Sequence, residues 1–309
     1  MRLNVLVLSV AVVTSTQVLG GEPVLGSSAE AAREAPLATD GGVAQVPSQS
    51  IPTTVVTGER LWNESQPTGS YQQPGWTDRR RFPGTRVYVA PAGTATFEFW
   101  TDTKVPFSSD GARVRTLWEM SFGLGHRLQL DLYLRTESTG TNPMSLESER
   151  VELRWALANW GVIPGNPTLY LEWIHQTAGP MRGEVKLLLG GEFSSRLYWG
   201  ANLFFESDLF GANTGHEYGL TGGLSYSLLD SKLSLGGEAR VEVTDDRRSG
   251  RVPLGVETLA GPAVSWRPVP SANVLLVWFV GPEFSRGSAA DPFAGTFVMQ
   301  PTVIAGWRF

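Results

Sequence analysis

The chain has 309 residues, a formal net charge of −5, 35 glycines and no cysteine. The lack of cysteine excludes disulfide bonds, thiolate metal sites and the lipid-bearing cysteine of a lipoprotein. With 41% hydrophobic, 10% aromatic and only 18% charged residues, the composition is neither that of a disordered protein nor that of a nucleic-acid-binding protein. We therefore expect no nucleic-acid partner.

The first residues are typical of a secretory signal peptide. Arg2 precedes an apolar stretch at 3–13, and small residues follow at Gly20 and Gly21. This stretch is too short for a transmembrane helix, which needs roughly 20 residues, so we expect residues 1–20 to be cleaved off. Since no later apolar run is long enough to span a bilayer as a helix, insertion in a membrane would have to use strands.

Residues 21–90 are rich in Gly, Pro, Ser, Thr and Gln and show no sustained helical or strand periodicity. This composition predicts a flexible, disordered extension in the periplasm. Arg79, Arg80 and Arg81 form its only dense basic run. We interpret the run as a solvated stretch before the first strand, with contact to anionic lipid headgroups as the alternative.

From residue 94 onward the chain alternates apolar and polar residues in segments that Gly, Pro, Asn, Asp and Ser separate, which is typical of antiparallel strands. The predicted strands are 94–104, 113–123, 127–136, 147–158, 168–176, 184–193, 197–207, 216–228, 232–243, 256–267, 272–285 and 296–309. In the third of them, Leu128 and Leu130 share one face, whereas Gln129 and Asp131 lie on the other.

The lengths of the connections indicate where these strands lie. Counted from the first strand, the odd connections are long and the even ones mostly tight, with 159–167 as the exception. Such segregation is typical of outer-membrane barrels, which have long loops at one end and short turns at the other. The sequence therefore predicts an all-β protein whose residues 91–309 form a transmembrane, antiparallel up-and-down β-barrel. A soluble, secreted barrel or sandwich is the alternative.

The last strand carries a pattern of its own. Val303, Ala305, Trp307 and Phe309 alternate up to the final residue. They resemble the C-terminal signal by which bacterial outer-membrane barrels are inserted, so we expect the barrel-assembly machinery to be a partner. The tryptophans on the predicted lipid-facing side, which would form interfacial girdles, are Trp155, Trp173, Trp199, Trp266, Trp278 and Trp307.

Three stretches carry a family resemblance: PAGTATFEFW at 91–100, SFGLGHRLQLDLYL at 121–134, and GEVKLLLG at 183–190 followed by GGEAR at 236–240. They resemble a family of bacterial outer-membrane β-barrels related to proteins assigned as transporters in aromatic-compound (phenol) degradation. The resemblance implies the outer membrane of a Gram-negative bacterium as location, lipid and lipopolysaccharide as partners, and a transport role. It implies no functional residue, because the shared motifs concern architecture.

Charged residues of the predicted strands would face the lumen, because an Arg or Lys facing lipid near the bilayer midplane costs ~2–4 kcal/mol. The predicted inward acids are Glu98, Asp102, Glu119, Asp131, Glu152, Glu172, Glu184, Glu192, Glu206, Glu217, Glu238, Glu242 and Glu257, and the predicted inward bases are Arg127, Arg135, Arg154, Lys186, Arg240, Arg267 and Arg308. The surplus of acids predicts a lumen that favours cations. The alternative is that acids and bases pair across the barrel and leave no open path.

Small residues gather on the inner faces of the predicted strands 216–228 and 232–243. They are Gly219, Gly223, Ser225, Ser234 and Gly236. Two interpretations remain open: the small side chains leave space along one wall, or they permit a strong local twist.

Three histidines, His126, His175 and His216, are the candidates for an enzyme site. A lipid-modifying barrel enzyme would need an activated Ser–His pair and an oxyanion site, and no local His-x-Ser pattern indicates one. The histidines are scattered, so we expect no metal and no cofactor. The sequence favours a non-enzymatic, narrow channel for ions or small solutes. The second interpretation is a closed barrel with a structural or ligand-binding role, and the lipid-modifying enzyme is the third.

Overall fold

The computed structural model describes residues 64–84, 86–108, 111–211, 214–246, 255–285 and 294–309. The predicted signal peptide and the part of the predicted extension before residue 64 lie outside these residues. Among the residues that the structure does describe, no helix has the length and apolar character needed to cross a bilayer.

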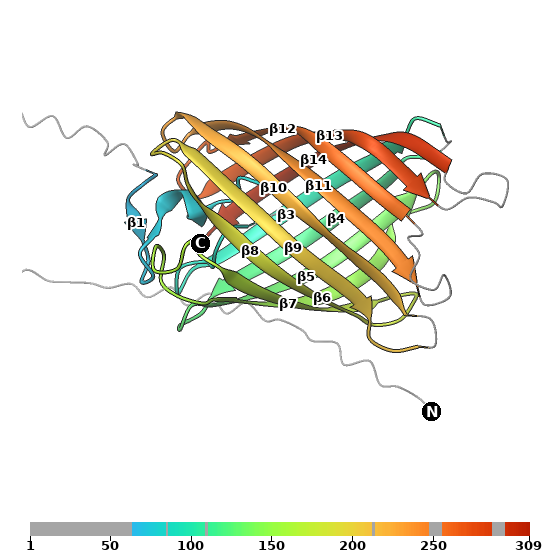
Figure 1. The fold of residues 1–309 in the computed structure, drawn as a ribbon, viewed down its shortest axis with the longest axis horizontal. Helices are drawn as coiled ribbons and strands as arrows, with labels where there is room; N and C mark the ends of the chain where they lie inside the picture. The colour runs from blue at the N-terminus through green and yellow to red at the C-terminus, as the bar shows by residue number, and fades with distance from the viewer. Residues whose placement is uncertain (1–63, 85, 109–110, 212–213, 247–254, 286–293) are drawn as a thin grey trace, which may run out of the picture. The chain divides into compact units, whose positions relative to one another are not determined.

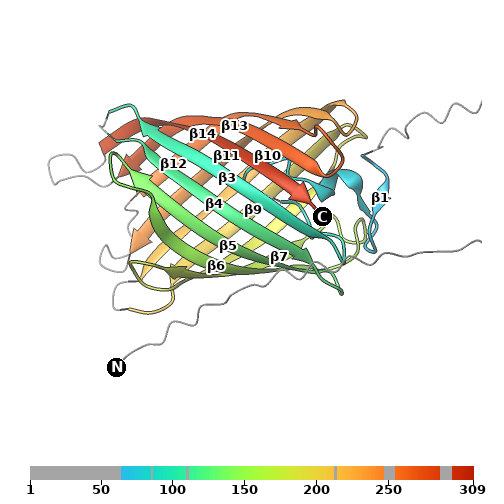
Figure 2. The same cartoon turned by 180° about the vertical axis from the view of Figure 1, so that it is seen from behind.

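Twelve antiparallel strands form a closed barrel (Figures 1 and 2). They are β3 (Ala95–Pro106), β4 (Arg113–Gly123), β5 (Leu128–Thr139), β6 (Ser145–Ala156), β7 (Thr168–Gln176), β8 (Arg182–Glu192), β9 (Leu197–Asp208), β10 (Gly215–Leu229), β11 (Leu233–Asp246), β12 (Gly255–Trp266), β13 (Ala272–Ser285) and β14 (Ala294–Arg308). Each strand pairs with the next along the chain, and β14 closes the barrel against β3.

This architecture confirms the predicted up-and-down barrel. The bounds of β4, β7 and β13 coincide with the predicted ones, and those of the other strands lie within about three residues, an offset normal for strand ends read from sequence alone. The pairing is shifted at two places, between Arg135 and Thr136 of β5 and between Ser227 and Leu229 of β10.

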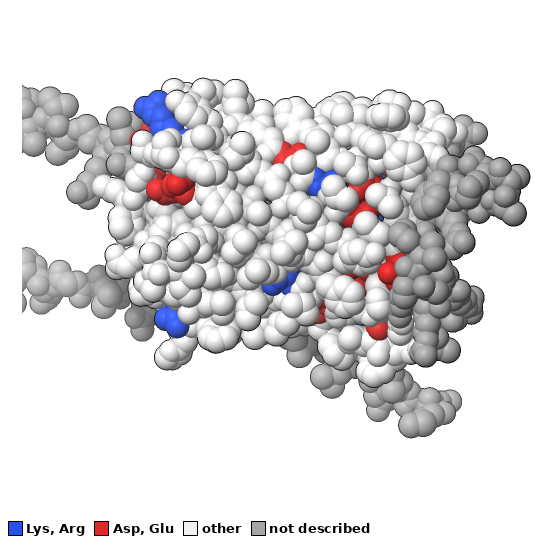
Figure 3. Space-filling view, viewed as in Figure 1, with Lys and Arg blue, Asp and Glu red and all other residues white. Residues whose placement is uncertain are grey.

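Apolar side chains cover the outside of the barrel. Because successive side chains of a strand point to opposite faces, each strand presents an apolar row outward and a polar row inward. Trp155, Trp173, Trp266, Trp278 and Trp307 are exposed on the outer face. Figure 3 shows a mostly uncharged wall, in which charged side chains surface at only a few places.

The outward positions also include the predicted insertion residues. Val303, Ala305, Trp307 and Phe309 are all exposed, whereas Ile304 between them is fully buried. The last residue is tied to the first strand of the barrel, since the backbone N–H of Phe309 donates to the carbonyl of Ala95. The four residues therefore share one face of β14, on the outside.

The described residues of 64–91 fold into the barrel rather than trailing away from it. They contain a two-stranded pairing of β1 (Pro67–Thr68) with β2 (Gln73–Pro74), followed by the short 3-10 helix η1 (Gly75–Asp78). We call the described part of 64–91 the plug. Figures 1 and 2 show β1 and η1 at the barrel end where the chain terminates.

The prediction of a flexible extension up to residue 90 is therefore wrong for the plug. Trp76, Phe82 and Tyr88 are each only 1% exposed. The physical reason is that the barrel supplies the apolar surface that this segment cannot make for itself. Burying three aromatic side chains provides the free energy that orders a Gly/Pro-rich chain.

Candidate functional site

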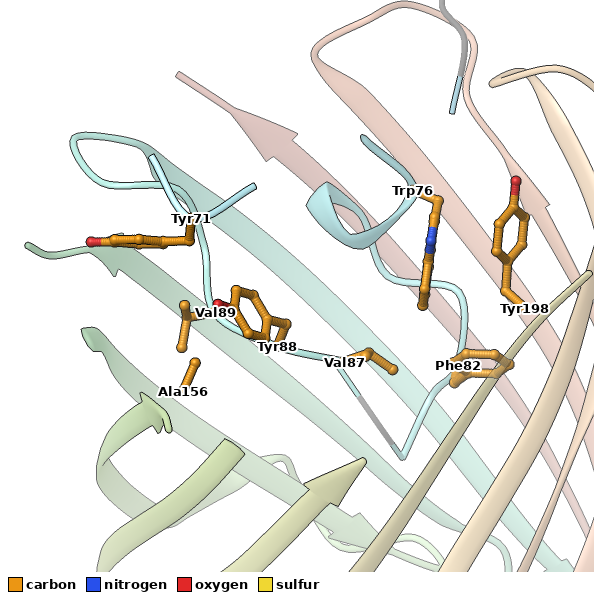
Figure 4. Packing of buried hydrophobic residues seen from close by; sticks show 8 residues of the cluster. All are labelled: Tyr71, Trp76, Phe82, Val87, Tyr88, Val89, Ala156 and Tyr198. Atoms are coloured by element: carbon orange, nitrogen blue, oxygen red, sulfur yellow. The ribbon is translucent and has the colours of Figure 1, made fainter. Parts of the chain in front are cut away.

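The plug lies against a part of the inner barrel wall that is made of glycines. Phe82 and Val87, whose side chains Figure 4 shows, pack on the wall of the barrel. Their contacts there are with Gly190 of β8, Gly200 of β9 and Gly223 of β10. A Cβ atom at Gly200 would lie 2.9 Å from Val87 Cγ2, and one at Gly223 would lie 2.5 Å from Phe82 Cδ1. We call these three glycines the glycine face. It has to stay free of side chains while the plug is in place.

Aromatic rings continue this contact toward the short-turn end of the barrel. Trp76 stacks on Tyr198 with ring centroids 4.8 Å apart and meets the edge of Trp160 at 5.6 Å. Its indole Nε1 donates a hydrogen bond of 2.6 Å to Glu192. Tyr88 also packs edge-on against Trp160, at 5.4 Å. Trp160 belongs to connection 157–167, so this unusually long turn serves to contact the plug.

Arg79, Arg80 and Arg81 are buried, contrary to the prediction of a solvated basic stretch. Arg79 and Arg81 both pair with Glu64, which is itself part of the plug. A buried charge is stable only when an opposite charge and hydrogen bonds accompany it. The acids of the plug and of the barrel wall supply those partners, and this explains why the run is not in solvent.

The three guanidinium groups differ in their electrostatic environment. Burial lowers the pKa of Arg81 to about 10 and lowers the pKa of Arg79 as well, where the neighbouring charge of Arg81 adds to the effect. Burial also opposes the charge on Arg80, but attraction by Glu98 and Glu119 outweighs it, so the pKa of Arg80 is raised. Arg80 is thus the arginine of this run that the wall acids hold most firmly in its charged form.

Arg80 bridges two acids of the barrel wall. Its Nε lies 2.7 Å from Glu98 Oε2 on β3, and its Nη2 lies 3.2 Å from Glu119 Oε2 on β4. These two acids stand directly opposite each other in the strand register. The guanidinium also lies over the ring of Trp100, 4.2 Å from its centroid.

Arg81 contacts the wall of small residues that the sequence singled out. It donates to the hydroxyls of Ser234 at 2.9 Å and of Ser225 and Ser227 at 3.2 Å. Its guanidinium lies 4.4 Å from the ring centroid of Tyr198. At this wall the small side chains therefore leave space that the plug occupies.

The backbone of Gly84 ties the plug to two side chains of the barrel wall. The N–H of Gly84 donates to Glu238 Oε1 at 3.0 Å, and its carbonyl accepts from Asn202 Nδ2 at 2.9 Å. A side chain at Gly84 would collide with the carboxylate of Glu238. Glu238 was predicted to face the lumen, and in the structure its carboxylate binds the plug at Gly84.

Next to Gly84 the lumen contains a chamber of about 300 Å³. The plug lines it with Arg80, Pro83, Gly84 and Arg86. Eight acidic and eight basic side chains line the chamber: Asp102, Glu119, Glu152, Glu172, Glu184, Glu206, Glu217 and Glu238, with Arg80, Arg86, Arg115, Arg135, Arg150, Arg154, Lys186 and Arg240. Four aromatic side chains also contribute, namely Trp100, Tyr133, Tyr170 and Phe279.

Acids and bases of the chamber wall pair with one another. Arg154 bonds to Glu152 and lies 3.4 Å from Asp131, and Lys186 lies 2.9 Å from Glu184. Such pairs satisfy charges that would otherwise be costly in a lumen shielded from water.

Acids and bases also form ion pairs toward the barrel end that has the long connections. Arg240 lies 2.5 Å from Glu257, which also pairs with Lys104, and Arg135 lies 3.0 Å from Glu147. Both regions of the lumen thus carry fixed charges of both signs in close contact.

The structure brings twelve of the predicted lumen residues together around the chamber: Asp102, Glu119, Arg135, Glu152, Arg154, Glu172, Glu184, Lys186, Glu206, Glu217, Glu238 and Arg240. The others lie elsewhere. Glu98, Glu192 and Arg308 contact the plug, and Asp131 pairs with Arg154. Arg127 and Arg267 lie in turns at the plug end, where they bond to backbone carbonyls. Glu242 is half-buried on β11, opposite Glu257.

Sequence reasoning missed two kinds of chamber residue. Arg115 and Arg150 lie on the inward side of strands whose bounds were predicted well, so strict alternation would have found them. Arg80 and Arg86 come from the plug, for which no periodicity was available. Because of these four bases, the acid surplus predicted for the lumen is not present at the chamber lining. Whether the lumen selects ions by charge stays a prediction.

The histidines lie apart from the chamber. His216 packs against Phe205 with centroids 5.2 Å apart, and its Nδ1 lies 3.8 Å from Asp245. His126 lies in the turn before β5, and His175 is exposed. Within the described parts of the chain, no group of three or more His, Asp or Glu residues is arranged to hold a metal ion.

No protein-family model and no curated protein matches the chain. An outer membrane channel from Pseudomonas putida F1 is similar in structure, with a TM-score of 0.49 and 10% identity over 74% of this chain and 99% of that one. For the NanC porin the TM-score is 0.46, with 10% identity over 67% of this chain and 98% of that one. For the KdgM porin, solved with disordered oligogalacturonate, the TM-score is 0.42, with 11% identity over 69% of this chain and 99% of that one. At these identities the likeness concerns the fold. The link to aromatic-compound degradation stays a prediction.

Proposed function

We propose that the protein is an outer-membrane barrel of a Gram-negative bacterium that admits small polar solutes to its lumenal chamber and conducts them only when the plug moves. The observation that carries this proposal is the position of the plug. It lies between the chamber and the short-turn end of the barrel, and Phe82 and Val87 fill the space above the glycine face.

The outer surface supports the membrane location. Exposed tryptophans such as Trp155 and Trp278 stand on a wall of apolar side chains, as expected for a barrel whose outer surface faces lipid. Short turns of such barrels face the periplasm and long loops face the cell exterior. The plug would then close the periplasmic end, and the chamber would open toward the cell surface.

The chamber lining supports small, polar solutes as the cargo. Its volume of about 300 Å³ lies at the lower end of the range of known ligand pockets. Charges of both signs offer hydrogen bonds to dipolar molecules, and aromatic faces such as those of Tyr133 and Tyr170 offer apolar contact. Because the fixed charges balance, the chamber with its plug in place would not concentrate ions of one sign.

Planar-bilayer conductance of a matched pair of variants tests the proposal. Gly223→Leu places a side chain where Phe82 lies, whereas the neighbouring Gly222→Leu places one where a Cβ meets nothing within 4 Å. We expect the wild-type barrel and Gly222→Leu to be mostly closed and Gly223→Leu to conduct in discrete steps. Silence of a Gly223→Leu barrel that is still folded, as judged by heat-modifiable migration in electrophoresis, would overturn the channel function.

That result would favour the second candidate, a closed barrel with a structural or ligand-binding role. The extent of the contacts favours it, since the plug is held at Glu98, Glu192 and Glu238 on different strands. A lipid-modifying enzyme remains the third interpretation. Lipopolysaccharide and the barrel-assembly machinery, through the last strand, stay the predicted partners.

A further inference from the structure

Glu98, Glu119 and Trp100 together have the chemistry of a binding site for a cationic group, and Arg80 of the plug occupies it. We infer that this part of the barrel wall binds the guanidinium or ammonium group of a small organic cation when Arg80 leaves. The inference rests on the proposed function, because it requires that the plug moves and that solutes reach the chamber.

The two carboxylates require a cation between them. Glu98 is 3% exposed and Glu119 is fully buried, and they face each other across paired strands. Like charges directly opposite in a sheet repel, and burial strengthens the repulsion. In this structure Arg80 relieves it through contacts of 2.7 and 3.2 Å. Once the plug moves, either another cation or a proton on one of the carboxyl groups would have to offset this repulsion.

Trp100 narrows the class of cation that fits. Its ring stacks on the guanidinium at 4.2 Å, while its indole Nε1 donates to Glu98 at 3.3 Å. An aromatic face attracts weakly hydrated organic cations. Two carboxylates beside such a face therefore match a guanidinium or ammonium group better than a strongly hydrated inorganic ion.

The site is built by the barrel alone. Glu98 and Trp100 lie on β3 and Glu119 on the adjacent β4, where Ser121 Oγ donates to Glu119 at 3.0 Å. Trp100 and Glu119 also line the chamber. The carboxylates and the ring would thus remain in position when the plug moves, and a solute in the chamber lies next to them.

The neighbouring arginines have a different arrangement. Arg79 and Arg81 pair with Glu64, and since Glu64 is part of the plug, their countercharge moves with them. Displacing Arg80, in contrast, leaves its two acids on the wall. Arg86 of the plug reaches Glu98 only at 3.9 Å. Of the run 79–81, Arg80 is therefore the residue that takes the place of a ligand.

Calorimetric titration of methylguanidinium into the refolded, full-length Arg80→Ala barrel tests the inference. We expect saturable binding that weakens at least about tenfold when Glu119→Gln is added. Arg79→Ala is the matched control: it also removes one arginine of the run but keeps Arg80 in the site, so we expect it not to bind. Sodium chloride at equal ionic strength should not compete.

Absence of binding to Arg80→Ala, or equal binding to Arg79→Ala, would overturn the inference. If Arg80→Ala does not give a heat-modifiable barrel, Arg80→Gln, which fills more of the space without a charge, replaces it. The proposed function fails separately. Binding of methylguanidinium to Arg80→Ala alongside a silent Gly223→Leu would keep the cation site and reject the channel, and the reverse pair of results would reject the cation site alone.

Discussion

Arg308, the last residue of β14, forms an ion pair with Asp78 of η1. The pair joins the end of the barrel to the plug from the inside. The next residue, Phe309, points the other way and is 73% exposed on the outer face. Two adjacent residues at the chain terminus thus contact different surroundings, and their substitution should have different effects.

Phe309→Ala should reduce assembly of the barrel in the outer membrane several-fold, because it removes the outward aromatic residue that resembles the insertion signal. The measurement is the amount of heat-modifiable protein in isolated outer membranes. Arg308→Ala is the control, since it leaves the outward row intact and should change the yield little. A similar loss for both variants would indicate that the terminal strand acts through general stability.

Trp76→Ala should expose the plug to trypsin. The substitution removes the stacking on Tyr198 and the hydrogen bond to Glu192, and truncating a buried Trp typically costs ~3–5 kcal/mol. Since Arg79, Arg80 and Arg81 are trypsin sites that the barrel buries, cleavage there should become at least about tenfold faster. Mass spectrometry of the fragments measures the rate. Trp278→Ala on the outer face should leave it unchanged.

The ion selectivity should depend on the position of the plug. With the plug in place the charges of the chamber balance, and displacing it removes Arg80 and Arg86 while Glu98, Glu119 and Glu238 stay on the wall. In a potassium chloride gradient, we expect the reversal potential of Gly223→Leu to shift toward the equilibrium potential of potassium, which indicates cation selectivity. Adding Glu238→Gln and Glu242→Gln should reduce it. Unchanged reversal potentials would disprove the role of these charges.

Removing Arg80 alone should lower the free energy of unfolding more than removing Arg80 together with the charges of its two acidic partners. Arg80→Met removes the guanidinium that pairs with Glu98 and Glu119, and breaking a buried pair in this way costs ~3–5 kcal/mol. Adding Glu98→Gln and Glu119→Gln should recover more than half of the loss. Urea unfolding in lipid vesicles, followed by tryptophan fluorescence, gives the free energies. A triple variant as unstable as Arg80→Met would contradict the ion-pair explanation.

The barrel could be predicted because its strands obey a simple rule. The alternation of Leu128 and Leu130 with Gln129 and Asp131 assigns both faces of β5, and residues outside that strand do not alter the pattern. The same rule predicts β4 and β13 to the residue.

The plug could not be predicted in this way. Phe82 and Val87 follow no period, because they are placed by the glycine face of strands more than a hundred residues later in the chain. Two signals did point to it: an inner wall with too many acids, and a single dense basic run at Arg79, Arg80 and Arg81. Arg80 of that run pairs with two wall acids, whereas Arg79 and Arg81 pair with Glu64 of the plug. This arrangement becomes apparent only when a segment outside the barrel is allowed to enter it.

The plug is continuous with the first barrel strand, which gives its movement a kinetic consequence. The N–H of Ala90 donates to Gln129 at 2.5 Å, and β3 begins only a few residues later, at Ala95. A plug tethered this closely would remain at an effective concentration on the order of millimolar near its own lumen. Reclosure would then be a unimolecular event, with a rate that does not depend on the number of barrels in the membrane.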